Sequence, residues 1–157
     1  MTVAWPAVLP APTVDGYVIR PGEAILRTEM EAGPARQRRR FTSVPSRIAV
    51  RWLLRRDQFA VFEAWYRWQA DEGVRWFSID LAGGLGMLGH EARFTRQFEA
   101  RPIAGVLWEV VSELEIRERP VLSEGALALL LQESCPGLLA AIDRLHTLVH
   151  RTLPETL

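Results

Sequence analysis

Three groups of residues have the types and spacing that chemistry could use, and the first is a run of glycines. Gly84, Gly86 and Gly89 match the GxGxxG pattern of dinucleotide-binding loops. That pattern binds a pyrophosphate where a strand leads into a helix whose N-terminus faces the phosphates. The residues that follow here, EARFTRQFEA, alternate like a strand, and no βαβ unit surrounds them. We therefore expect a glycine-rich hairpin loop at 82–90. A small ligand-binding domain that uses Gly83–His90 is the weakest alternative.

The second group consists of residues that could bind a metal or act as a nucleophile. His146 and His150 lie four apart, with Asp143 three residues before them, which is a spacing that can hold zinc. There is no HExxH motif, so the polar edge of an amphipathic helix explains them better. Cys135 is the single cysteine, has no nearby histidine and precedes a proline, whereas a reactive thiol needs a base. We expect no enzymatic activity, no catalytic residue, no metal site and no cofactor.

The third group is an arginine cluster formed by Arg36, Arg38, Arg39 and Arg40, which Phe41 follows. The chain has 19 basic residues, all arginine, and 19 acidic residues, so its formal net charge is zero. This balance argues against general nucleic-acid binding. A GC-rich coding sequence explains the absence of lysine better than a functional choice of arginine does. Because arginine is enriched at interfaces, we favour a subunit contact. A solvated loop, and less so a nucleic-acid site, remain open.

A strand, a helix and a second strand form the central part of the chain. Residues 47–54 alternate with period two, which predicts a half-buried strand. Residues 57–72 repeat their apolar positions at three and four, which predicts a helix with Asp57 as N-cap and an end at Gly73. Residues 74–81 alternate again. The apolar positions are Ile48, Val50, Trp52 and Leu54 on the first strand and Phe59, Phe62, Trp65 and Tyr66 on the helix.

Further strands flank this part on both sides. We expect strands at 23–30 and 93–99, and a turn formed by Arg101-Pro102 and Ala104-Gly105. Residues 106–118 form the longest alternating run, ~43 Å at roughly 3.3 Å per residue, which would extend past an ordinary sheet. Strands that do not alternate with helices predict an α+β fold with an antiparallel sheet. At 157 residues we expect one domain, with a body at 23–120.

The two ends of the chain differ from the body. Residues 1–22 contain four prolines and predict an extended arm, which lies either on its own domain or on a neighbouring subunit. Residues 121–157 are leucine-rich and predict a helical tail that starts at Ser123 and needs a partner. No apolar run approaches the ~20 residues of a membrane span, and the N-terminus lacks the basic region of a signal peptide. Besides the four arginines, the interface candidates are Trp5, Trp68, Leu130, Leu131, Leu145 and Leu148.

The order of these segments resembles a known family of structural proteins. The residues that carry the resemblance are RTEMEAGPARQRRRF, IAVRWLL, the Phe62-x-x-Trp65 helix, the WF strand at 73–81, Arg93-Phe94, the strand at 108–115, and the opening WPAVLPAP and GYVIRP. Together they cover about residues 5–120. They are similar to the minor tail and distal tail proteins of long-tailed bacteriophages, which also occur in gene transfer agents and prophages. Residues 123–157 depart from that pattern.

The resemblance implies a tail-tube-like β-sandwich or split barrel with one flanking helix, plus the helical tail. It implies a ring of subunits, commonly a homo-hexamer, that links the tail tube to the hub and contacts the tape measure. The protein would then be part of the virion, at the tail tip, and would be assembled in the host cytoplasm without nucleic-acid contact. A tail completion or assembly factor remains the alternative.

Overall fold

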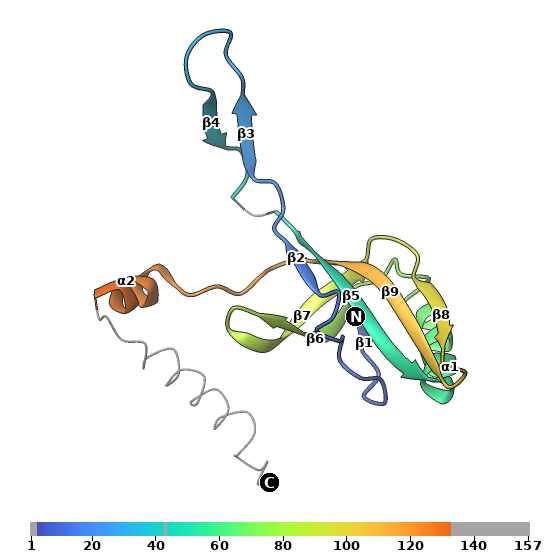
Figure 1. The fold of residues 1–157 in the computed structure, drawn as a ribbon. Helices are drawn as coiled ribbons and strands as arrows, with labels where there is room; N and C mark the ends of the chain where they lie inside the picture. Colours follow the sequence, from blue (N-terminus) through green and yellow to red (C-terminus); the bar gives the residue numbers. More distant parts are fainter. Residues whose placement is uncertain (1–2, 43, 133–157) are drawn as a thin grey trace. The chain divides into compact units, whose positions relative to one another are not determined.

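Figure 1 shows the computed structural model of the chain, which describes residues 3–42 and 44–132. Its central pair of strands is β5 (Ser46–Arg55) and β9 (Leu107–Ile116), which run antiparallel from Ser46 opposite Ile116 to Arg55 opposite Leu107. The predicted alternation along both strands is confirmed. The side chains on the core face are Ile48, Val50, Trp52 and Leu54 from β5 and Val110, Ser112, Leu114 and Ile116 from β9, all buried.

The central pair belongs to a seven-stranded sheet of order β1-β6-β7-β9-β5-β2, with β8 also paired to β9. The α+β class is confirmed, but β1 runs parallel to β6, so the sheet is mixed and the prediction of a wholly antiparallel sheet is wrong. The remaining strands of this sheet are β1 (Val3–Ala4), β2 (Val18–Arg20), β6 (Phe77–Gly83), β7 (Gly86–Phe94) and β8 (Glu99–Ile103).

Strand β9 does not extend past the sheet, contrary to our expectation. It has ten residues, and β5 covers one of its edges along the whole length. On the other edge, β8 pairs with its first half and β7 with its last three residues. Two short strands thus share one long neighbour, and this makes β9 a central strand.

Helix α1 (Arg56–Trp68) covers the core face with the four aromatic residues that the sequence predicts. Its N-cap is Arg55, not Asp57, which lies in the first turn. The helix also ends before residue 72, because the next residues turn left-handed. Asp71 and Glu72 both have φ of 53°, and Gly73 has φ of 93°. The Glu72 amide donates a hydrogen bond of 2.9 Å to the Tyr66 carbonyl, which closes this turn.

The proline-rich arm lies on its own domain. Trp5 stacks on Trp52 with ring centroids 5.2 Å apart, and it meets Trp65 edge to face at 5.0 Å. The Trp65 indole donates a hydrogen bond of 3.1 Å to the Ala4 carbonyl. Further along the arm, the Thr13 amide bonds to the Arg51 carbonyl at 2.7 Å. The arm thus forms both ends of the sheet, as β1 and β2, and such very short edge strands offer another chain little to pair with.

Two predicted boundaries are wrong in the region of β7 and β8. The predicted strand 93–99 is interrupted, since β7 ends at Phe94 and β8 begins at Glu99. The alternation nevertheless continues, because Phe94 and Phe98 both contact Tyr66, each with ring centroids 5.0 Å apart. Arg101 and Pro102 lie inside β8, so that half of the predicted turn is wrong, whereas Ala104 and Gly105 form the turn as predicted, both with positive φ.

The glycine-rich hairpin expected at 82–90 is confirmed as a hairpin, but its loop is much shorter than predicted, because β6 ends only at Gly83 and β7 begins at Gly86. Only Gly84 and Leu85 form the turn, and Gly86 takes φ of 95° at the start of β7. No helix follows the glycines, so their conformation is that of a β-hairpin rather than a phosphate loop.

A second compact unit contains the tip of this hairpin and helix α2 (Glu124–Gln132). The Ala126 amide donates to the Ser123 hydroxyl at 3.2 Å, so the predicted start of this helix is confirmed. Cys135, His146, His150 and the predicted helix from 138 to about 152 lie outside the described residues. No helix in the described part of the chain has the length and apolar character that crossing a membrane requires.

Candidate interaction site

The predicted arginine cluster is part of a separate two-stranded hairpin, and not of a loop. Strand β3 (Ile25–Thr28) pairs with β4 (Arg36–Arg39), from Ile25 opposite Arg39 to Thr28 opposite Arg36. In the described chain the two strands pair only with each other (Figure 1). The predicted strand at 23–30 is confirmed in position, but the sequence does not show that the arginines would form its partner.

This basic hairpin, residues 23–42, has almost no core of its own. Every residue of β4 is exposed, and of β3 only Leu26 is partly covered. Three large apolar side chains nearby are about half exposed, namely Ile25 at 51%, Met30 at 45% and Phe41 at 48%. A single two-stranded hairpin is at best marginally stable in water. The hairpin therefore gains little stability from packing within the described chain.

The arginines of β4 divide into two kinds. Arg39 folds back onto its own chain, where it donates to the carbonyl oxygens of Phe41 at 3.0 Å and Thr42 at 2.7 Å. Arg40 stacks on Phe41, 5.2 Å from the ring centroid. In contrast, Arg36 and Arg38 have no ion pair among the described residues. They line a shallow depression of about 560 Å³ together with Leu26, Thr28, Met30 and Gln37. These two guanidinium groups are free to pair with carboxylates of another chain.

The base of the hairpin requires a glycine. A Cβ atom at Gly22 would lie 2.4 Å from the Pro45 carbonyl oxygen and 2.3 Å from a methyl carbon of Val44. Next to this close approach, the Arg40 amide donates to the Ala24 carbonyl at 2.7 Å. The two chain segments that connect the β2–β5 pair to the β3–β4 pair, residues 21–24 on one side and 40–42 and 44–45 on the other, therefore stay close together.

Charge is distributed unevenly along the chain even though it sums to zero. The basic hairpin contains five arginines and three glutamates, which leaves it at +2. Residues 120–157 contain four acidic residues and two arginines, which leaves them at −2, and the rest of the chain is neutral. Opposite charges thus lie on two different segments, an arrangement that favours contact between them when copies of the chain meet.

The structure places the other predicted interface residues in different surroundings. Trp68 is 74% exposed, with the Arg67 guanidinium 5.2 Å from its ring centroid. Trp5 packs against its own core instead. In α2, Leu130 is half-buried and Leu131 is 75% exposed. Leu145 and Leu148 lie outside the described residues.

Sequence reasoning missed a cluster of ion pairs around a buried glutamate, on the face of the sheet that points away from the hydrophobic core. Glu109 is only 4% exposed and accepts hydrogen bonds from Arg101 on β8 and Arg51 on β5, while Arg51 also pairs with Asp15. The bonds from Arg101, followed by those from Arg51, hold the pKa of the Glu109 carboxyl below its usual range. The sequence shows a glutamate in an alternating strand, and only the strand register reveals its two partners.

Within the described residues, no group of three or more His, Cys, Asp or Glu side chains could hold a metal ion. Comparison with known proteins finds no family model, no curated protein and no solved structure that matches this chain. The interaction site is therefore defined by the geometry of the chain itself.

Proposed function

We propose that this chain is a structural protein of a phage-type tail tip, a distal tail or minor tail subunit that forms a ring between the tail tube and the hub. The observation that carries the proposal is the basic hairpin, an exposed pair of strands with two free arginines and hardly any core. Such an element gains its stability by docking. The order of segments that resembles tail proteins gives the assembly in which the docking would take place.

The finer fold that we propose is a strongly curled sheet, related to the split barrel of tail-tube-like proteins. Trp5 contacts both Trp52 on β5 and Phe77 on β6, with ring centroids at 5.2 and 6.1 Å. Strands β7 and β9 separate β5 from β6 in the sheet order. A single indole reaches both only if the sheet curls around it. This curvature supports the proposal.

The contact that builds the ring is heterologous in this proposal. The basic hairpin of one subunit meets the acidic C-terminal segment of the next, so that each copy both gives and receives one contact. A head-to-tail contact of this kind closes into a ring when its rotation permits, here a homo-hexamer. The tail tube, the hub and the tape measure are the neighbouring proteins, and the complete ring lies in the virion.

Native mass spectrometry and negative-stain imaging of the purified chain test this proposal. We expect a ring whose formation is lost in the double variant Arg36→Gln/Arg38→Gln, because both free guanidinium groups are removed. Arg119→Gln is the control, since Arg119 is exposed and has no ion-pair partner in the described part of the chain. A stable monomer, even with neighbouring tail proteins present, would refute the ring. Absence from purified particles would favour the assembly factor.

A further inference from the structure

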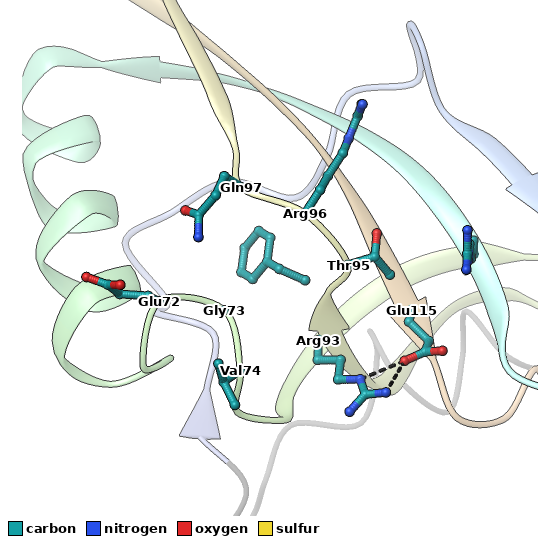
Figure 2. Close-up of a pocket in the computed structure, with 10 residues that line it drawn as sticks. Glu72, Gly73, Val74, Arg93, Thr95, Arg96, Gln97 and Glu115 are labelled. Carbon is teal, nitrogen blue, oxygen red and sulfur yellow. Dashed lines mark hydrogen bonds and ion pairs between the residues drawn. The ribbon is translucent and has the colours of Figure 1, made fainter.

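A polar pocket of about 550 Å³ lies where β7 and β9 end and β5 begins. In Figure 2, Glu72, Gly73 and Val74 lie on one side of it, Gln97 lies across from Glu72, Arg93 is paired with Glu115, and the Arg96 side chain extends outward from the other labelled groups. The remaining lining residues are Arg47, Phe94 and Thr95. The turn that follows α1 lines the pocket, which uses no residue of the basic hairpin.

Two arginines of this pocket depart from the pairing pattern of the sheet. On β2, β5, β7 and β8, the arginines pair with a carboxylate, as Arg20 does with Glu113 at 3.4 Å and Arg93 with Glu115 at 2.6 Å. Arg47 is the exception among the strand arginines of the described sheet. It lies opposite Glu115 in the register, but Glu115 pairs with Arg93 from the other side. Arg96 likewise has no side-chain partner in the described residues, and it lines the same pocket.

The net charge of the pocket indicates how many negative charges a ligand should carry. Three arginines face two glutamates, which leaves one positive charge. A single carboxylate neutralises this charge, and a guanidinium group binds a carboxylate through two parallel hydrogen bonds. A nucleic-acid strand brings several phosphates and would be repelled by Glu72 and Glu115. The charge balance therefore favours one carboxylate over a polyanion.

The walls of the pocket also suit a peptide. Val74 is 70% exposed at its rim, which offers apolar contact to the stem of a side chain. The turn that presents Val74 is held in an uncommon conformation, with three successive residues at positive φ. The Tyr66 hydroxyl fixes this turn through a hydrogen bond of 2.8 Å to the Glu72 carbonyl. A Cβ atom at Gly73 would lie only 2.9 Å from the Cβ of Phe94, so the turn lies tightly against the pocket floor.

We propose that this pocket binds a carboxylate of an extended segment of another protein, with Arg47 and Arg96 as the groups that recognise it. The carboxylate belongs either to an acidic side chain or to a chain terminus. Either source offers a partner to the unpaired guanidinium groups of the pocket, and the exposed Val74 offers apolar contact to the neighbouring atoms of the segment. This inference does not depend on the proposed ring.

The test uses the full chain labelled with ¹⁵N and three short peptides of matched length, followed by NMR titration. The first peptide has one internal glutamate and an amidated end, the second has glutamine and a free terminal carboxylate, and the third has glutamine and an amidated end. We expect the first or the second to shift the amide signals of residues 72–74 and 95–97, and the third to leave them in place. The peptide that binds identifies the source of the carboxylate.

Variants separate recognition by charge from loss of the fold. We expect Arg47→Gln and Arg96→Gln each to weaken the binding about tenfold, which corresponds to ~1.4 kcal/mol. Arg56→Gln is the control, because Arg56 is exposed on α1 and does not line the pocket. Charge reversal by Arg96→Glu should abolish the binding, while the dispersed spectrum shows that the chain stays folded.

Three results would overturn the proposal. The first is equal binding of all three peptides, or binding of none at millimolar concentration. The second is a set of shifts that lies away from the pocket. The third is tighter binding of a short single-stranded oligonucleotide, which would assign the pocket to a phosphate backbone.

Discussion

The charge of the Glu109 side chain depends on the two arginines that surround it. Its carboxylate is buried, yet it remains charged because two guanidinium groups donate to it from the neighbouring strands. Burial alone would favour the neutral acid, and the two arginines outweigh that effect. Arg51 is the better covered of the two, with 21% of its side chain exposed against 74% for Arg101. We therefore expect solvent to screen the Arg51 pair less.

The first prediction concerns the acid side of the stability curve. Since the folded state lowers the pKa of Glu109, its charge stabilises the fold above the unfolded value of ~4.3. That contribution disappears as the pH falls through the lower, folded pKa. We expect Glu109→Gln to lower the urea midpoint at neutral pH, and the gap from the wild type to narrow towards pH ~3. The exposed Glu63 provides the control Glu63→Gln; a gap independent of pH would contradict the prediction.

The second prediction concerns Tyr66, whose hydroxyl holds the left-handed turn. Burial, and then the charge of Glu72, raise the pKa of this phenol. A raised pKa means that the neutral hydroxyl stabilises the fold fully below the unfolded value of ~10, and that this stability is lost as the pH rises through the folded value. We expect Tyr66→Phe to cost ~1 kcal/mol at neutral pH.

Urea unfolding at several alkaline pH values checks this prediction. Between pH ~9 and ~11, the wild type should lose more stability than Tyr66→Phe, because only the wild type has this phenol to ionise. Tyr17 is the only other tyrosine and is present in both proteins. Parallel curves would show that folding does not raise the pKa of Tyr66, and coincident curves would show that its hydroxyl does not stabilise the fold.

At the scale of elements, the sequence predicts correctly the strands and helices in which one face packs on the core, because that face shows as a regular spacing of apolar residues. The alternation of Ile48 to Leu54 defines β5, and the spacing of Phe59 to Tyr66 defines α1, because one face of each element packs on the core. The break between β7 and β8 was missed for the same reason, since Phe94 and Phe98 both face inward on either side of it.

Features that depend on pairing were beyond the sequence pattern. The arginines of β4 have no apolar alternation, so only their pairing with β3 makes them a strand. The parallel β1–β6 pair joins residues that are far apart in the chain, and no local pattern marks it. Likewise, Arg47 has no ion pair among the described residues because Glu115 pairs with Arg93, and only the register of β5, β7 and β9 shows this. The candidate arginines of the hairpin could be named in advance, but not the surface that they form.

The third prediction compares two tryptophans. Trp5 packs between Trp52 and Trp65, whereas Trp68 is largely exposed on the same helix that carries Trp65. We expect Trp5→Ala to destabilise the fold by ~3–5 kcal/mol, as large-to-small changes in a core do. Trp68→Ala should change the free energy of unfolding by less than ~0.5 kcal/mol. Urea unfolding monitored by circular dichroism measures both; similar losses would mean that the arm is not part of the core.

At the scale of the whole molecule, assembly separates from folding. The basic hairpin contributes no residue to the core cluster. We expect that replacing residues 23–42 by a tight Asn-Gly turn leaves the thermal midpoint of the body nearly unchanged, because β2 and β5 still pair. Native mass spectrometry of this variant should show only monomers. A ring that persists would place the contact elsewhere on the chain.

The C-terminal segment gives the complementary prediction. Deleting residues 121–157 removes the acidic half of the proposed contact, so the body should fold while ring formation fails. Raising the salt concentration in the intact chain should act in the same direction, since exposed charges are screened beyond ~8 Å at physiological ionic strength. Analytical ultracentrifugation over a salt series measures both effects. Normal assembly of the truncated chain would refute the contact.

The position of β9 also has a consequence for synthesis. The strand in the middle of the sheet is the last one to leave the ribosome, while its long partner β5 is completed at Arg55. At about 5–20 residues per second, roughly 3–12 s pass between the synthesis of Arg55, the last residue of β5, and that of Ile116, the last residue of β9. During that interval β5 has only the short β2 as a strand partner. Completion of the sheet therefore depends on β9, and nascent chains halted before residue 107 should bind chaperones that longer ones release.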